Sequence, residues 1–159
     1  GLNVTLNGNF LMTQAVVNKM IDSDLKYCKD GGVILNIASD LGVIAPDQRI
    51  YKKHDNESFD EQNVKPAFYS AAKFAIIGMT KYLATYFGER GIRVNCISPG
   101  GVWNDKIPQH MVEKIASLNP MNRMANINEY KGAISFLCSD ASSYMTGGNL
   151  VVDGGKTTW

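Results

Sequence analysis

Tyr69 and Lys73 lie four residues apart in an apolar stretch with helical periodicity, so their side chains share one face of the predicted helix. A free tyrosine has a pKa of about 10, too high for a base at neutral pH. A neighbouring ammonium group favours the phenolate and lowers that pKa. Such a pair can exchange a proton with an alcohol or a carbonyl. The sequence contains this spacing once, and a surface pair without a chemical role fits it about equally well.

Ser39 adds a hydroxyl group to this pair. It ends the apolar, β-branched run over 33–39, which is typical of a buried strand. In open parallel sheets the carboxyl ends of the strands border the ligand crevice. A hydroxyl there can hydrogen-bond a substrate oxygen beside Tyr69. A serine that simply ends a strand in a turn would have the same pattern.

A glycine pair follows a second predicted strand, 92–98. Gly100 and Gly101 would let the backbone approach a ligand closely, again at a carboxyl strand end. Taken by itself, this segment fits a simple turn better.

Strands and helices alternate along the chain and must position these residues. The hydrophobic patterns predict strands over 33–39, 92–98 and 149–155, and helices over 4–22, 67–91, 105–119 and 128–139, the last with Asn126 or Asn128 as its N-cap. This order predicts an α/β fold with three parallel strands, flanking helices and right-handed crossovers. The polar segment 46–66 interrupts it as a long loop.

Composition excludes several classes of protein. The chain has 159 residues, 45% of them hydrophobic, which suits one domain or part of one. Its net charge of +1 indicates neither nucleic acid nor a membrane surface as a partner, and no apolar run reaches the length of a membrane span. Cys28, Cys96 and Cys138 have no metal-ligand spacing, so we expect no metal and free thiols in a reducing compartment, the cytoplasm.

Four segments in order resemble the short-chain dehydrogenase/reductase family. They are "NIAS" at 36–39, similar to the end of the strand with the catalytic serine; "YSAAK" at 69–73, similar to Tyr-x-x-x-Lys; "GIRVNCISPGGV" at 91–102, similar to the strand and loop that reach the nicotinamide; and 123–155, similar to the C-terminal signature ending in Asp-Gly-Gly. The resemblance implies a Rossmann-type, doubly wound parallel sheet. Since the match covers only the second half of that fold, we expect 1–159 to be a single partial domain.

The resemblance also implies an activity. Members of the family are NAD(P)-dependent oxidoreductases that transfer a hydride between nicotinamide and a carbonyl or alcohol substrate. Tyr69 would donate or accept the proton, Lys73 would assist it and hold the nicotinamide ribose, and Ser39 would orient the substrate oxygen. "APDQRIY" at 45–51 and "SPGGVWN" at 98–104 are similar to members from surface-glycan and flagellin-modification pathways, which favours a sugar-type substrate; a ketoacyl or sugar-alcohol reductase stays open.

Cofactor contacts and a proton relay follow from the same resemblance. The cofactor-binding residues it implies, besides Tyr69 and Lys73, are Pro99, Gly100, Gly101, Val102 and Asn104, the last in place of the usual threonine. The helix motif Asn-x-x-Gly-x-Phe, placed by Gly8 and Phe10, has Thr5 at the position of its asparagine. A threonine hydroxyl often bonds back to a carbonyl one turn earlier, so we expect a weaker but working relay.

The segment 46–66 departs from the family. Ser39 and Tyr69 are 30 positions apart, more than is usual, and the excess begins next to the serine. We therefore expect the loop to overhang the pocket, with Asp40 and Arg49 as substrate contacts. The basic side chains of the loop would meet an anionic substrate such as a phosphorylated or nucleotide-linked sugar; they are Arg49, Lys52, Lys53 and His54. Five acidic residues in the same loop favour a simply solvated segment instead.

The chain contains no glycine-rich turn of the kind that binds a dinucleotide, and it begins with Gly1 inside a helical pattern. We therefore expect an absent N-terminal part, an open edge along the strand 33–39, and no dinucleotide binding or turnover by these residues alone. The choice between NAD and NADP would also lie outside them. An inactive family member serving as a binding or scaffold subunit is the alternative. The family resemblance implies a homodimer or homotetramer through the helices 4–22 and 67–90 and the last helix and strand.

Overall fold

A computed structural model describes residues 1–21, 31–54, 56–58 and 60–159 of the chain, so Cys28 lies outside the described residues. Its strands β1 (Gly32–Ile37), β2 (Ile92–Pro99) and β3 (Asn149–Val152) form one parallel sheet in the order β1-β2-β3. The α/β fold with three parallel strands and flanking helices is confirmed. In the described sheet β1 pairs only with β2 and is an edge strand.

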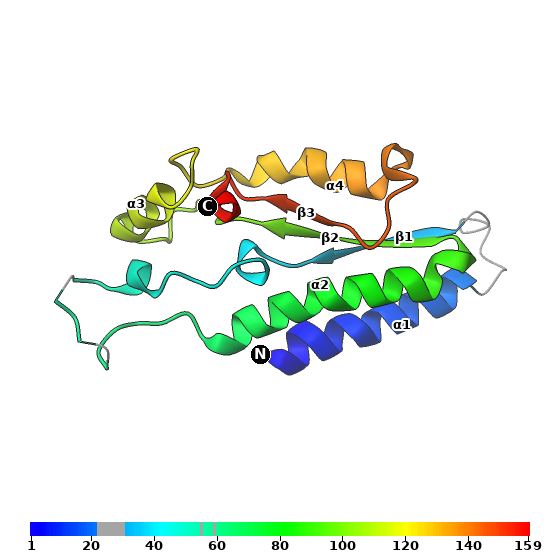
Figure 1. The fold of residues 1–159 in the computed structure, drawn as a ribbon, viewed down its shortest axis with the longest axis horizontal. Helices are drawn as coiled ribbons and strands as arrows, with labels where there is room; N and C mark the ends of the chain where they lie inside the picture. The colour runs from blue at the N-terminus through cyan, green and yellow to red at the C-terminus, as the bar shows by residue number, and fades with distance from the viewer. Residues whose placement is uncertain (22–30, 55, 59) are drawn as a thin grey trace.

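Helices cover both faces of this sheet (Figure 1). α1 (Gly8–Ile21) and α2 (Ala67–Phe87) lie on one face, and α4 (Lys131–Cys138) lies on the other. The core beneath α1 and α2 includes Val17, Leu83, Phe87, Ile92 and Val94, and the core beneath α4 is centred on Ile97, Tyr130 and Leu137. β2 lies between both layers, which explains its nearly continuous burial.

Two of the helices are shorter than the hydrophobic periodicity predicts, because 3₁₀ turns replace their predicted ends. α2 ends at Phe87 in the 3₁₀ turn Gly88–Arg90, and Gly91, with a φ of 72°, returns the chain to β2. Before α4, the 3₁₀ turn Ile127–Tyr130 is capped by Asn126, whose side chain accepts from the Asn128 amide while Glu129 accepts from the Asn126 amide. Of the two predicted caps, the structure therefore selects Asn126.

The first helix opens in a wider turn. Asn3–Asn7 form a π-helical turn that continues into α1, and Thr5 lies at its centre. Single π-turns inside helices are rare and occur frequently at functional sites. The hydrophobic periodicity of 4–22 contains no sign of this widening.

The carboxyl ends of all three strands point to one side of the molecule (Figure 1). α3 (Gln109–Ser117), the C-terminus and the described residues of the segment 46–66 lie on that side too. A buried hydrogen bond of 2.9 Å from Asn36 Nδ2 to Thr80 Oγ1 fixes β1 to α2. None of the described helices is long and apolar enough to cross a membrane, and no three described His, Cys, Asp or Glu side chains gather as a metal site.

Candidate active site

A cavity of about 450 Å³ opens at the carboxyl edge of the sheet. Its walls come from the ends of β1 and β2, from α2 and α3, from the base of the segment 46–66 and from the C-terminal segment. It brings together eight of the residues predicted from the sequence, namely Ser39, Asp40, Tyr69, Lys73, Pro99, Gly100, Gly101 and Val102.

Lys73 joins α2 to the end of β1. Its Nζ donates to the carbonyl oxygen of Ile37 at 2.9 Å, and burial lowers the pKa of this half-buried side chain. The turn after β1, Asp40–Gly42, packs directly against α2 at this point. A Cβ on Gly42 would lie 2.8 Å from the carbonyl carbon of Lys73, so only glycine permits this approach. The turn Asp40–Gly42, which follows Ser39, is thereby held at a fixed distance from Lys73.

Two ammonium groups lie near the ring of Tyr69. Lys65 Nζ is 4.1 Å from the centre of its ring, and Lys73 Nζ is 5.8 Å from it. Cations at such distances are attracted to the face of an aromatic ring. The tyrosine is therefore held in a positively charged part of the cavity.

Ser39 caps the turn that follows β1. Its Oγ accepts from the Leu41 amide at 3.2 Å and donates to Asp40 Oδ1 at 2.7 Å. Asp40 Oδ2 in turn accepts from Lys156 Nζ at 2.7 Å, in an ion pair whose side chains are 7% and 10% exposed. The orientation of the serine hydroxyl therefore depends on a carboxylate that is itself held by a lysine from the C-terminal segment.

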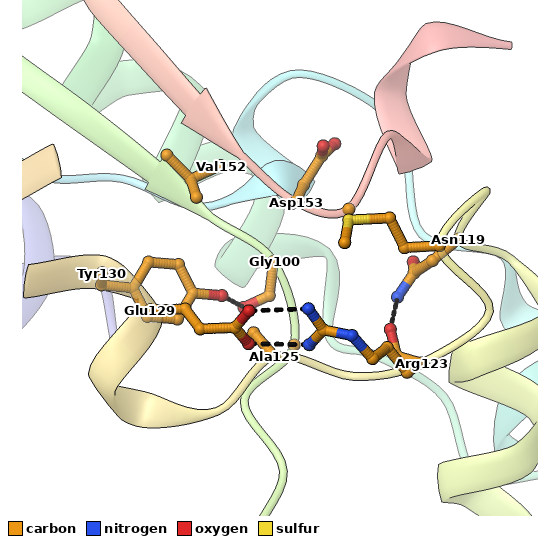
Figure 2. A pocket seen from close by; sticks show the side chains of 11 residues that line it. Gly100, Asn119, Arg123, Ala125, Glu129, Tyr130, Val152 and Asp153 are labelled. Carbon is orange, nitrogen blue, oxygen red and sulfur yellow. Dashed lines mark hydrogen bonds and ion pairs between the residues drawn. The ribbon is translucent and has the colours of Figure 1, made fainter. Parts of the chain in front are cut away.

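The glycine loop after β2 is held by backbone and side-chain contacts with β3 and with the turn before α4 (Figure 2). The Gly100 amide donates to the Val152 carbonyl at 2.9 Å, and Tyr130 Oη donates to the Gly100 carbonyl at 3.1 Å. A Cβ on Gly100 would lie 2.8 Å from the Cα of Asp153. Burial raises the pKa of Tyr130, which keeps its hydroxyl protonated as a donor. The backbone of the loop thus has a defined position.

A smaller cavity of about 80 Å³ lies behind the same loop. Figure 2 shows Arg123 and Glu129 paired beside it by two hydrogen bonds of 2.6 and 2.7 Å. Asn119 donates to the Arg123 carbonyl at 2.7 Å, so this pair also connects to the turn after α3. These contacts support the Tyr130 side of the loop.

Three residues predicted for the site lie outside the cavity. Arg49 pairs with Asp47 at 2.6 Å and its side chain is 85% exposed; the hydrogen bond between them lowers the pKa of Asp47. Asn104 accepts from the Lys106 amide and caps a turn beyond the loop. Thr5 lies in the π-helical turn that packs against α2, and no hydrogen bond within the described residues joins it to Lys73.

The cavity also contains residues that sequence reasoning missed. The base of the segment 46–66 contributes Ile50, Tyr51 and Lys65, α3 and the residues before it contribute Ile107, Met111 and Ile115, and the C-terminal segment contributes Lys156. A signal existed for two of them. Lys65 precedes Tyr69 by the same four positions that separate Tyr69 from Lys73, and Lys156 follows the third strand at its carboxyl end.

Comparison with known proteins shows which family of proteins has a similar sequence. The family model described as enoyl-(acyl carrier protein) reductase matches residues 57–157. D-threitol dehydrogenase of Mycolicibacterium smegmatis is 35% identical over 162 residues, which cover 98% of this chain and 53% of that protein. The chain spans about half the length of the curated relatives it matches.

Solved structures of dehydrogenases are similar to the chain as well, again over about half of their length. A short chain dehydrogenase from Leptospira borgpetersenii with bound NAD+ has a TM-score of 0.84 and 38% identity, over 98% of this chain and 54% of that one. A 4-hydroxyisoleucine dehydrogenase complexed with NADH and succinate has a TM-score of 0.78 and 30% identity, over 99% of this chain and 57% of that one.

Proposed function

The chain belongs to the short-chain dehydrogenase/reductase family, and on that premise we propose that the protein is an NAD(P)-dependent oxidoreductase acting on a carbonyl or alcohol. The observation that carries this proposal is the meeting of Ser39, Tyr69 and Lys73 in one cavity with the glycine loop. Two of these residues come from α2 and one from the turn after β1, so the fold itself assembles the set.

Each residue has a distinct part in the proposed reaction. In the direction of alcohol oxidation, Tyr69 takes the hydroxyl proton, and Lys73 places a positive charge beside it. Ser39, whose hydroxyl donates to Asp40 in this structure, would turn that one donor to the substrate oxygen when substrate binds and so orient it. Nicotinamide, when bound, supplies or accepts the hydride. In the direction of reduction, Tyr69 returns the proton to the oxygen.

The residues present fit the nicotinamide end of the cofactor. Pro99, Gly100, Gly101 and Val102 line the same cavity as Lys73, with a backbone free of bulky side chains at the two glycines. The sequence has no glycine-rich turn for the pyrophosphate. We therefore expect the 159-residue chain alone to show no saturable binding of NADH or NADPH and no turnover; quenching of protein fluorescence that saturates with either would contradict this.

The choice between NAD and NADP stays a proposal. Similar structures are described with NAD+ and NADH, which favours testing NAD first. A sugar-type substrate remains our proposal as well, supported by the similarity to D-threitol dehydrogenase, whose substrate is a sugar alcohol.

Replacement of Tyr69 tests the proposed function. In the full-length gene product, Tyr69→Phe removes the proton-exchanging oxygen, and we expect turnover to fall at least about a hundredfold. Tyr144→Phe, at a fully exposed tyrosine outside the cavity, is the matched control and should leave turnover unchanged. Unchanged turnover in Tyr69→Phe would favour the alternative, a catalytically inactive binding or scaffold subunit.

Self-association through α1 and α2 is part of the same proposal. Large apolar side chains are exposed on these helices, among them Phe10, Leu11, Met12, Phe74, Tyr82 and Tyr86. Such patches are typical of protein interfaces, and they support a homodimer or homotetramer. The free thiols of Cys96 and Cys138 support the cytoplasm as its compartment.

A further inference from the structure

We propose that Lys65 binds a negatively charged group of the substrate, so that the substrate is a carbonyl or alcohol compound carrying a carboxylate or phosphate. This inference rests on the proposed oxidoreductase function and names the chemical class of its substrate. The carrying observation is the placement of the Lys65 ammonium beside Tyr69 in the wall of the cavity.

The charges of the cavity do not balance. Its lining contains one carboxylate, Asp40, and three ammonium groups, Lys65, Lys73 and Lys156. Asp40 is paired with Lys156 at 2.7 Å. Lys73 donates to the Ile37 carbonyl, which carries no charge. Among the described lining residues, two positive charges therefore lack a carboxylate partner. A cavity that is lined by excess positive charge and has walls of low dielectric constant attracts anions.

The backbone of Lys65 is held in place by hydrogen bonds with another residue of the loop. Its amide donates to Gln48 Oε1 at 2.9 Å, and Gln48 Nε2 donates to the Lys65 carbonyl at 3.2 Å. Gln62 Nε2 in turn donates to the Gln48 carbonyl at 3.1 Å. The backbone of Lys65 is thus fixed on both sides immediately before Pro66 and α2. Preorganisation of this kind lowers the entropic cost of binding a ligand.

The contact with the Tyr69 ring leaves the ammonium able to bind a ligand. An ammonium group has three N–H donors. At 4.1 Å from the ring centre the Lys65 ammonium makes a cation–π contact with Tyr69, and this contact does not use all three donors. A substrate whose oxygen contacts Tyr69 and Ser39 has its neighbouring groups within reach of Lys65. Lys65 would thereby have the role that the sequence pattern predicted for Arg49, which pairs with Asp47 outside the cavity.

A pair of isosteric ligands tests the inference without turnover. Succinate and succinamide have nearly the same shape and differ in charge, and dissociation constants for both are measured by NMR titration of the 159-residue chain without nicotinamide. We expect succinate to bind about two- to fivefold more tightly than succinamide, the range typical of a partly exposed charge pair. In Lys65→Gln the ratio should fall toward the smaller preference that the remaining charge of Lys73 supports, and Lys65→Arg, which keeps the charge, should retain most of the original ratio.

The control is Lys131→Gln, which removes the same charge from an exposed position on α4, away from the cavity. It should leave the ratio unchanged. Equal affinity for the two ligands, failure of both to bind, or a ratio that is undiminished in Lys65→Gln would each overturn the inference. Because no hydride transfer is involved, the two results are distinguishable: failure of the Tyr69→Phe experiment would overturn the proposed reaction, whereas the ligand titration tests the anion contact of Lys65 by itself.

Discussion

Asp40 and Lys156 are 116 positions apart in the sequence, yet their side chains form a 2.7 Å ion pair in the wall of the cavity. The pair joins the turn after β1 to the segment after β3. Because the other carboxylate oxygen of Asp40 accepts from Ser39, the C-terminal segment helps to orient the serine hydroxyl. The wall of the site thus contains residues that follow both edge strands of the described sheet, β1 and β3.

Removal of the lysine from this pair should destabilise the fold. Lys156→Met leaves the buried Asp40 carboxylate without its partner, and breaking a buried pair costs about 3–5 kcal/mol. Urea denaturation should therefore show a loss of about 3 kcal/mol in the free energy of unfolding. The double variant Asp40→Asn/Lys156→Met, which removes both charges, should recover much of that loss. A loss below about 0.5 kcal/mol in the single variant would contradict a coupled pair.

Tyr130 should position the glycine loop. Tyr130→Phe keeps the buried ring and removes only the hydrogen bond to the Gly100 carbonyl. Loss of one such bond corresponds to about 1 kcal/mol, so we expect the KM for the nicotinamide cofactor of the full-length gene product to rise about fivefold, with the substrate KM unchanged. In the 159-residue chain the amide NMR signals of Gly100 and Gly101 should shift.

Tyr144→Phe is the matched control for this prediction, because Tyr144 is fully exposed. It should change neither the cofactor KM nor the amide signals. Unmoved Gly100 and Gly101 signals in Tyr130→Phe would show that the hydroxyl does not hold the loop.

Acid should weaken the turn that caps α4. The hydrogen bond from Arg123 lowers the pKa of Glu129 from 4.5 to about 2 in the folded chain. A carboxyl whose folded pKa is depressed stabilises the fold above its unfolded pKa, and this stability is lost as the pH falls from about 4.5 toward 2. Thermal unfolding of Glu129→Gln should accordingly depend less on pH in this window than that of the wild type. Parallel curves for the two proteins would refute the assignment.

Thr5 offers a test of the proton relay. Its π-helical turn packs against α2, the helix that carries Lys73. If water and backbone groups complete the relay, Thr5→Asn in the full-length gene product should give similar or higher turnover. A collapse of turnover with an unchanged far-UV circular dichroism spectrum would mean that the threonine itself is required.

Local spacing made a large part of the fold and site predictable. Tyr69 and Lys73 share a helix, and Ser39 ends a strand, so periodicity and the strand-end rule allowed the prediction that they meet. The alternatives, a surface pair and a plain turn, were set aside by the family resemblance. The three strands and their parallel order followed from alternation with helices. Each of these features depends on residues that are near one another in sequence or on a general rule of topology.

Contacts across long separations were not predictable in this way. No spacing relates Asp40 to Lys156, and Tyr130 has the pattern of an ordinary core aromatic until its hydroxyl is placed near Gly100. Arg49 was expected in the pocket because of its charge, whereas its local pairing with Asp47 keeps it outside. Which basic side chain of the loop faces the cavity depends on backbone contacts such as those of Gln48 with Lys65.

The open edge of β1 is linked to the chemistry of the site by a single carbonyl group. Ile37 ends the strand and is 47% exposed, and its carbonyl oxygen accepts the hydrogen bond from Lys73. A strand that paired with this edge and fixed the Ile37 carbonyl would restrain the lysine as well. By thermodynamic reciprocity, a ligand that orders Lys73 must favour that pairing to the same extent. Protection of the β1 amides from hydrogen exchange and ligand affinity in the cavity should rise together.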